Sequence, residues 1–259
     1  MAHRPRKRFG QHFLTDVSVI DKIIALIAPQ PSETIIEIGP GEGVLTEHLL
    51  ASRAKIVAIE IDRDLAQNLT NRFAARRNFN LINEDVLKVE LRTLVQSEPV
   101  RIVGNLPYNI STPLLQHLFA EISLISQMVF MLQREVVKRM CAASGGGDFG
   151  RLSILTQTHC RAINALAIPP TAFSPPPKVD SAIVALTPHS DQLDESLKSA
   201  LATVTRHAFS QRRKKLKTGL KALFSTAQIS AAGIDENIRP DQLSIDAYIA
   251  LAKQLSAAE

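Results

Sequence analysis

The tetrapeptide NLPY (105–108) brings together groups that could act on an amine. It follows VRIV (100–103), an apolar stretch that is typical of a buried strand. The side-chain oxygen of Asn105 and the main-chain carbonyl of Leu106 could accept hydrogen bonds from the two N–H bonds of an amine, and the ring of Tyr108 could stack on a base. The alternative interpretation of the tetrapeptide alone is a proline turn capped by asparagine.

Two acceptors at this position would solve a specific difficulty of exocyclic amines. The nitrogen lone pair of such an amine is delocalised into the ring of the base, so the amine is a poor nucleophile. Acceptors directed at both N–H bonds favour a tetrahedral nitrogen, whose lone pair can then attack the methyl group of a sulfonium. No strong general base is needed, because the methylated amine is acidic enough to lose a proton to water.

A glycine-rich turn and a later acid indicate a site for such a cofactor. The motif GPGEG (39–43) follows an apolar stretch, with Glu37 two residues before it, and Glu60 ends the next apolar stretch, 21 residues after Gly39. Glycines let a ligand approach the backbone closely, and a carboxylate in the place of Glu60 can accept hydrogen bonds from both hydroxyls of a ribose. The G-x-G-x-G spelling fits S-adenosylmethionine better than a dinucleotide, which has a pyrophosphate. A plain tight turn is the alternative.

Asp85 lies after the third apolar stretch, NFNLI (78–82). An acid there is expected at the carboxyl edge of the sheet, where open α/β sheets bind ligands. Its carboxylate could accept a hydrogen bond from the exocyclic amine of the cofactor's adenine. It could equally cap the helix that follows.

Short apolar stretches that alternate with helical ones predict the scaffold. The expected strands are 34–39, 55–61, 78–82, 100–105 and 126–132, and the expected helices between them are 44–52, 63–76 and 112–121. This alternation predicts an α/β fold with a mostly parallel, doubly wound, Rossmann-like sheet.

The second half of the chain has a different pattern. Two further strand-like stretches, 161–168 and 181–187, flank a proline-rich segment and are expected to pair antiparallel at the edge of the sheet. The remainder has helical spacing. We therefore expect an N-terminal domain over 1–189, with a basic arm at 1–10, and a small C-terminal helical domain over 190–259.

Bulk properties exclude several classes of protein. The chain has 259 residues, of which 45% are hydrophobic, yet no stretch is long enough to form a membrane helix. The basic N-terminus lacks the apolar segment of a secretory signal, so a cytoplasmic location is expected. Cys141 and Cys160 fit no metal or disulfide pattern, and no metal site is expected.

The positive charge is concentrated in two stretches without acids, 1–8 and 206–217. Ten of the 30 Lys and Arg lie there, which leaves 20 against 25 Asp and Glu in the rest of the chain. Two such stretches on an otherwise acidic protein favour binding to a polyanion such as nucleic acid. A solvated helix face is the alternative for either stretch alone.

Eight motifs in order extend over nearly the whole chain: RFGQHFL, EIGPGEGVLT, IEIDRDL, NEDVL, GNLPYNISTPLL, FMLQREVVKRM, FGRLS and AFSPPPKVDSAIVAL. Together they resemble the ribosomal RNA adenine N6-dimethyltransferase family, and most closely its bacterial small-subunit branch. The resemblance implies a class I methyltransferase fold. It also implies transfer of four methyl groups from S-adenosyl-L-methionine to two adjacent adenines near the 3′ end of 16S rRNA, in a late precursor of the 30S subunit.

The resemblance also implies roles for individual residues. The cofactor contacts would be His12, Leu14, Gly39, Gly41, Glu60, Asp85 and Asn105. The catalytic group would be Asn105, Leu106, Pro107, Tyr108 and Phe173, the last stacking on the flipped adenine. From the residues alone, Phe173 would be a core residue. His12 stands where the family has either Asn or His, which leaves its contacting atom open. The glycine-rich SGGGDFG (144–150) departs from the family pattern and is expected to form a loop.

Contacts to RNA are expected from basic residues of both acid-free stretches. These residues are Arg6, Lys7, Arg8, Arg206, Arg212, Arg213, Lys214, Lys215 and Lys217. The expected partner is 16S rRNA within a pre-30S particle, with no DNA or membrane partner, and we expect a monomer.

Three alternative functions are compatible with parts of the pattern. A large-subunit, macrolide-resistance type of 23S rRNA adenine methyltransferase shares the fold and the chemistry, but the triple proline 175–177 and the NLPY spelling favour the small-subunit enzyme. A ribosome-assembly checkpoint without catalysis would not need the intact glycine turn and Glu60. DNA adenine methyltransferases usually carry an acidic D-P-P-Y tetrad, which this sequence lacks.

Overall fold

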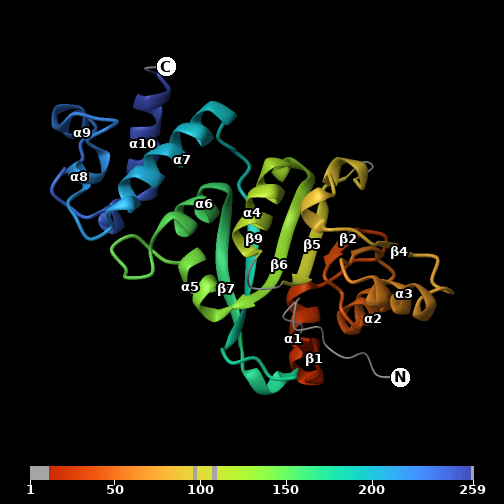
Figure 1. Cartoon of the computed structure of the whole chain (residues 1–259). Coiled ribbons are helices and arrows are strands. Elements are labelled where there is room, and N and C mark those ends of the chain that lie inside the picture. The colour runs from red at the N-terminus through yellow and green to blue at the C-terminus, as the bar shows by residue number, and fades with distance from the viewer. Residues whose placement is uncertain (1–11, 96–97, 107–109, 258–259) are drawn as a thin grey trace. The chain divides into compact units, whose positions relative to one another are not determined.

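The computed structural model describes residues 12–95, 98–106 and 110–257 (Figure 1). These residues form two compact units. The first unit extends to Val137 and includes Ile163–Pro188, and the second consists of Lys138–Ala162 together with the chain from His189 onward. The chain leaves the first unit near the expected boundary after residue 189. However, the segment 138–162 groups with the C-terminal helices, which the sequence pattern did not predict.

A seven-stranded sheet forms the frame of the first unit, in the order β4-β3-β2-β5-β6-β9-β7. Its strands are β2 (Thr34–Ile38), β3 (Lys55–Ile59), β4 (Phe79–Ile82), β5 (Val100–Asn105), β6 (Ile125–Gln133), β7 (Cys160–Ile168) and β9 (Ser181–Pro188). The strands from β4 to β6 run parallel, and β9 pairs antiparallel with β6. The predicted strands and the Rossmann-like α/β class are thereby confirmed.

The strand order reverses between β2 and β5, so the chain winds outward from this point in both directions. At such a switch point the connections that follow two neighbouring strands diverge and leave a crevice at their carboxyl ends. The glycine turn follows β2, and Asn105 is the last residue of β5. The fold therefore brings the two principal motifs of the sequence to one crevice.

Helices follow the strands as expected, and two of them begin at an aspartate that caps the helix. They are α1 (Val17–Ile27), α2 (Val44–Ala51), α3 (Arg63–Arg72) and α4 (Ser111–Ala120). The Asp16 carboxylate accepts hydrogen bonds from two backbone N–H groups at the start of α1, and Asp62 does the same for α3. Short 3-10 turns connect other elements: η2 (Val86–Lys88), η3 (Leu91–Thr93), η4 (Ile122–Leu124) and η5 (Pro170–Ala172).

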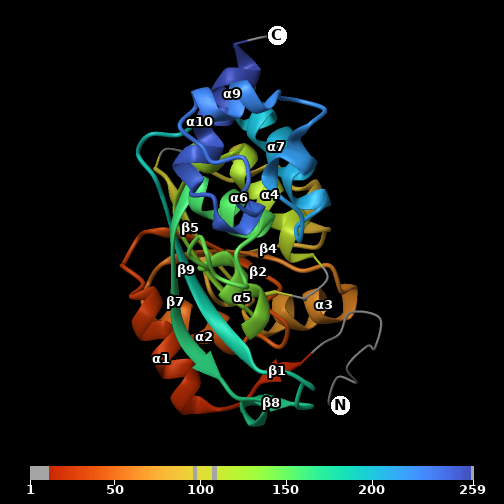
Figure 2. The same cartoon turned by 90° about the vertical axis from the view of Figure 1, so that its left-hand side faces the viewer.

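A two-stranded sheet that the sequence pattern did not predict joins distant parts of the first unit. In it, β1 (Phe13–Leu14) pairs antiparallel with β8 (Phe173–Ser174) (Figure 2). In this pairing Leu14 lies opposite Phe173. The backbone N–H of Thr15 extends this contact by donating to the carbonyl of Ala172 at 2.8 Å. This small sheet fixes the segment around His12 at the mouth of the crevice.

The second unit is helical and has its own hydrophobic core. It contains α6 (Arg151–His159), α7 (Glu195–Ser210), α8 (Leu216–Leu220), α9 (Thr226–Ala231), the 3-10 turn η6 (Pro240–Gln242) and α10 (Ile245–Ser256), while α5 (Arg134–Met140) leads into it. Helix α6 was not predicted, because its buried face carries the polar residues Ser153 and Thr156 and so lacks an apolar stripe. Phe149, Val204 and Tyr248 are fully buried in this core.

Candidate cofactor and target-amine site

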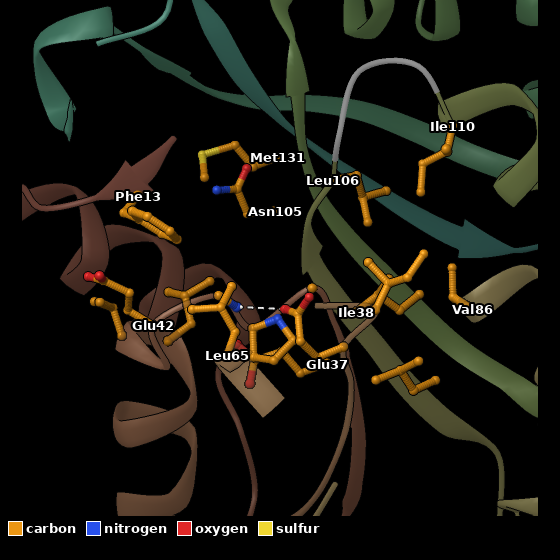
Figure 3. Close-up of a pocket in the computed structure, with 18 of the residues that line it drawn as sticks. Phe13, Glu37, Ile38, Glu42, Leu65, Val86, Asn105, Leu106, Ile110 and Met131 are labelled. Atoms are coloured by element: carbon orange, nitrogen blue, oxygen red, sulfur yellow. Dashed lines mark hydrogen bonds between the residues drawn. The ribbon is translucent and has the colours of Figure 1, made fainter. Parts of the chain in front are cut away.

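A cavity of about 340 Å³ opens at the carboxyl ends of β2, β3 and β5 (Figure 3). Every residue predicted to contact the cofactor lines it, namely His12, Leu14, Gly39, Gly41, Glu60, Asp85 and Asn105. Leu106, whose carbonyl was predicted to hold the amine, lines it as well. Residues from five separate segments thus meet in one pocket, although their roles there remain predictions.

The glycine turn adopts a backbone that side chains would obstruct. Gly39, Gly41 and Gly43 all have positive φ angles, between 60° and 80°. A Cβ atom at Gly41 would lie 3.3 Å from the Phe13 ring, and one at Gly43 would lie 2.6 Å from Leu69. The turn therefore needs glycine both for its conformation and for close packing.

Glu60 is held rigidly beside this turn. One carboxylate oxygen accepts a hydrogen bond from the N–H of Gly41 at 3.2 Å, and the other accepts from the N–H of Asp62 at 2.9 Å. Burial raises the pKa of Glu60, while the hydrogen bonds from Asp62 and Gly41 oppose that rise. Each oxygen keeps a second lone pair, so the carboxylate can still accept from a ligand's hydroxyl groups.

A second buried carboxylate, Glu37, lies on the floor of the cavity and was not among the predicted site residues. It is 1% exposed, and it accepts a hydrogen bond from the Thr46 hydroxyl at 2.7 Å. Burial raises the pKa of Glu37 to about 7, the Thr46 hydrogen bond opposes the rise, and the charge of Glu60 adds to it. Its position two residues before the glycine turn was the available sequence signal. Two acids in one small cavity favour a ligand with donors or positive charge.

Asp85 combines the two roles that its sequence position left open. Its side chain accepts a hydrogen bond from the N–H of Leu87 at 3.0 Å and so caps η2, yet it also lines the cavity. Figure 3 shows Val86, Leu106 and Ile110 on the same side of the pocket, where they supply apolar surface. A flat, apolar ring with an exocyclic amine fits a slot of this composition.

The Asn105 side chain is oriented by a distant part of the backbone. Its amide nitrogen donates to the main-chain carbonyl of His12 at 3.3 Å, which leaves the amide oxygen available to another donor. The N–H of Leu106 donates to the carbonyl of Met131 at 3.1 Å. Figure 3 shows Asn105 next to Met131, across the cavity from Glu37. Pro107 and Tyr108 lie outside the described residues, as do Arg6, Lys7 and Arg8.

Phe173 lies apart from the other predicted catalytic residues. Its side chain is 4% exposed and packs in the hydrophobic core with Leu14, and it is not among the described residues that line the cavity. The segment after it does reach the site, because Nδ1 of His12 donates to the carbonyl of Pro175 at 2.8 Å. Stacking of Phe173 on a base remains a prediction.

The predicted RNA-binding residues of 206–217 lie in the second unit. Arg206, Arg212, Arg213 and Lys214 are exposed, and of these Arg212 also hydrogen-bonds to main-chain carbonyls. Lys215 contacts Asn237 at 3.1 Å, and Lys217 lies 3.5 Å from Glu236.

Two kinds of feature are absent from the described residues. Over 12–95, 98–106 and 110–257, no cluster of three or more His, Cys, Asp or Glu side chains could hold a metal ion. Within the same ranges, none of the helices has the length and apolar character that crossing a membrane requires.

The family model and two curated proteins that match this chain carry names of ribosomal RNA methyltransferases. The family model described as ribosomal RNA adenine dimethylase matches residues 2–257. A protein of Pseudomonas fluorescens named ribosomal RNA small subunit methyltransferase A is 52% identical over 98% of this chain and 95% of its own length. A protein of the same name in Methylococcus capsulatus is 48% identical over 99% of this chain and 100% of its own length.

Two solved structures are similar over most of both chains. A dimethyladenosine transferase from Plasmodium falciparum has a TM-score of 0.78 at 26% identity and covers 93% of this chain and 96% of its own. The 23S rRNA methyltransferase ErmE has a TM-score of 0.73 at 25% identity, with coverage of 94% and 99%.

Proposed function

The chain belongs to the ribosomal RNA adenine dimethylase family, and from this premise we propose that it dimethylates N6 of two adjacent adenosines near the 3′ end of 16S rRNA. The methyl donor is S-adenosyl-L-methionine, and the substrate is a late precursor of the 30S subunit. Identity of about half to proteins named as small subunit methyltransferases, over almost the whole of both chains, supports this choice. The observation that carries the chemistry is the Asn105 oxygen, which accepts no hydrogen bond from the described residues and lines the same cavity as the glycine turn and Glu60.

The residues of the cavity suit the donor. When bound, S-adenosylmethionine supplies an electrophilic methyl group on a positively charged sulfur. Glu60 would accept hydrogen bonds from the ribose hydroxyls, and Asp85 would accept one from the adenine amine between the apolar side chains of Val86 and Ile110. The glycine turn would pass close to the ligand without obstruction, and the acidic floor at Glu37 favours its positive charge.

The target amine would be held by two acceptors at the end of β5. The Asn105 oxygen and the Leu106 carbonyl would each accept one N–H of the adenine amine, and this directs the nitrogen lone pair at the methyl group. Because His12 holds the amide nitrogen of Asn105, the oxygen is already oriented before the adenine arrives. The adenine must leave its stack to reach the site, at a cost of a few kcal/mol.

RNA binding would use the exposed cations of the second unit and the basic arm at 1–10. Phosphate contacts of this kind hold the RNA in register while the base is extruded, and they weaken as salt rises. We further propose that the protein acts as a monomer in the cytoplasm.

Methyl transfer to purified particles tests the proposal. The chain and labelled S-adenosylmethionine are incubated with unmodified 30S particles, and the modified bases are then mapped. We expect four methyl groups on two adjacent adenosines near the 3′ end of 16S rRNA, and none on mature 30S particles, 50S particles or DNA. Label on 23S rRNA would favour the large-subunit alternative, and binding without any transfer would favour a checkpoint without catalysis.

A further inference from the structure

The basic stretch 206–217 does not use all of its cations in the same way. Arg212 is held by three acceptors: its Nη2 donates to the carbonyls of Gly147 and Phe149, and its Nε lies 3.8 Å from the Asp241 carboxylate. In contrast, within the part of the chain that the structure describes, the exposed side chains of Arg213 and Lys214 have no ion-pair partner. Neighbouring cations therefore have different surroundings.

The carbonyls that Arg212 contacts belong to the glycine-rich loop 144–150. Residues 144–148 are exposed, and a Cβ atom at Gly145 or Gly147 would meet nothing within 4 Å. The loop is fastened at its end by Phe149, which is fully buried and packs against Phe209 at 6.5 Å between ring centroids. Near its start, the N–H of Gly145 donates to the carbonyl of Asp241 at 2.7 Å.

Arg212 lies in the short connection between α7 and α8, which covers 211–215. The N–H of Lys214 donates to the carbonyl of Gln211 at 2.8 Å and closes a turn there. After the turn, Leu216 is fully buried and anchors the start of α8. Arg212 on one side and Leu216 on the other therefore fasten the turn that carries Arg213 and Lys214.

We propose that Arg212 is a positioning residue and not a phosphate ligand. Its guanidinium fastens the turn 211–215 to the glycine-rich loop and to Asp241, so that Arg213 and Lys214 project from a fixed backbone toward the RNA. The inference rests on the proposed function, because it takes RNA as the ligand of these two cations. Three acceptors around one planar group require the forked donors of arginine, which the single ammonium of lysine does not supply.

The dependence of binding on salt separates positioning from direct contact. Binding of the full chain to unmodified 30S particles is measured at a fixed Mg²⁺ concentration and at about 50 to 200 mM KCl, because each phosphate contact adds to the slope of log K against log [KCl]. We expect Arg213→Ala, the matched control for direct contact, to reduce the magnitude of the slope by about one. Arg212→Ala should leave the slope unchanged and weaken binding about 5-fold at every salt concentration. This corresponds to a loss of roughly 1 kcal/mol of binding free energy.

A second variant keeps the test decisive if Arg212→Ala folds poorly. Arg212→Lys retains the charge, so a residue that contacts phosphate directly would keep nearly wild-type affinity. If Arg212 is a positioning residue, Arg212→Lys should weaken binding about 5-fold and leave the slope of log K against log [KCl] unchanged. Amide hydrogen exchange over residues 145–149 should also become faster in both variants, while affinity for S-adenosylmethionine stays at the wild-type value.

Three results would overturn the inference. They are a slope reduced by about one in Arg212→Ala, wild-type affinity in Arg212→Lys, or unchanged exchange over the loop. If the wild-type protein and Arg213→Ala bind the particles equally and independently of salt, the proposed RNA contact fails instead. If only the positioning role of Arg212 is wrong, Arg213→Ala still changes the slope, so the two outcomes can be told apart.

Discussion

The side-chain nitrogen of Asn105 donates a hydrogen bond to the main-chain carbonyl of His12, at 3.3 Å. This contact joins the end of β5 to a segment 93 positions away in the chain. It decides which end of the amide can face a ligand, because the nitrogen is used, while the oxygen accepts no hydrogen bond from the part of the chain that the structure describes. His12 itself is held by its ring, whose Nδ1 donates to the carbonyl of Pro175. The proposed acceptor for the target amine thus depends on a chain of contacts that starts outside the cavity.

Asn105→Ala should impair the second methyl transfer more than the first. After one transfer only one N–H remains on the amine, so the loss of one acceptor removes a larger share of its orientation. We expect both steps to slow by a factor of about 100 or more, with the second affected more strongly. Resolving mono- and dimethyladenosine over time measures both steps. Asn105→Asp is the control, because it keeps an acceptor but cannot donate to His12, and an equal loss in both steps of Asn105→Ala would reject the prediction.

Gly41→Ala should weaken cofactor binding and lower stability. Alanine is strained at the φ angle of +60°, and its Cβ atom would lie 3.3 Å from the Phe13 ring. We expect the free energy of unfolding to fall by about 1 kcal/mol and the affinity for S-adenosylmethionine to fall about tenfold. Calorimetry and chemical denaturation measure the two effects. Gly147→Ala, where a Cβ atom meets nothing within 4 Å and φ is not positive, should change neither, and equal behaviour of the two variants would contradict the role of Gly41.

Glu37 should make the stability of the protein depend on pH. Its pKa in the folded state is raised from 4.5 to about 7, chiefly by burial, so its stabilising contribution is fully present below pH 4.5 and is lost as pH rises through about 7. Glu37→Gln removes this titration and can still accept a hydrogen bond from Thr46. The unfolding free energy of the wild type minus that of the variant should fall by about 3 kcal/mol at most between pH 4.5 and pH 8. Urea denaturation at several pH values measures it, and a difference that stays constant or rises with pH would refute the prediction.

Phe173→Leu tests whether the buried ring has a role beyond packing. Leucine retains an apolar side chain in the core but offers no ring for stacking, which is worth roughly 1–3 kcal/mol per base. If the ring stacks on the adenine, methyl transfer should slow about tenfold at unchanged affinity for S-adenosylmethionine. Phe224→Leu, at a buried phenylalanine of the second unit, controls for lost packing. Equal transfer rates for the two variants would make Phe173 a core residue only.

The sequence by itself determined the frame of the site. The strands were predictable because apolar runs and turn residues are local signals, and their parallel order then places Gly39, Glu60 and Asp85 at one edge. We expect a ligand site at that edge to include them. The same local logic predicted the functional importance of Asn105 from its position at the end of β5.

The tertiary structure decided how individual side chains are used. The pairing of Leu14 with Phe173, the contact of His12 with Asn105, and the acceptors around Arg212 all join segments far apart in the chain. Two-residue strands and single hydrogen bonds have no periodicity, so the sequence contains no local signal for them. For Glu37, the sequence showed its position two residues before the glycine turn. Its raised pKa, however, follows from burial that only the folded chain creates.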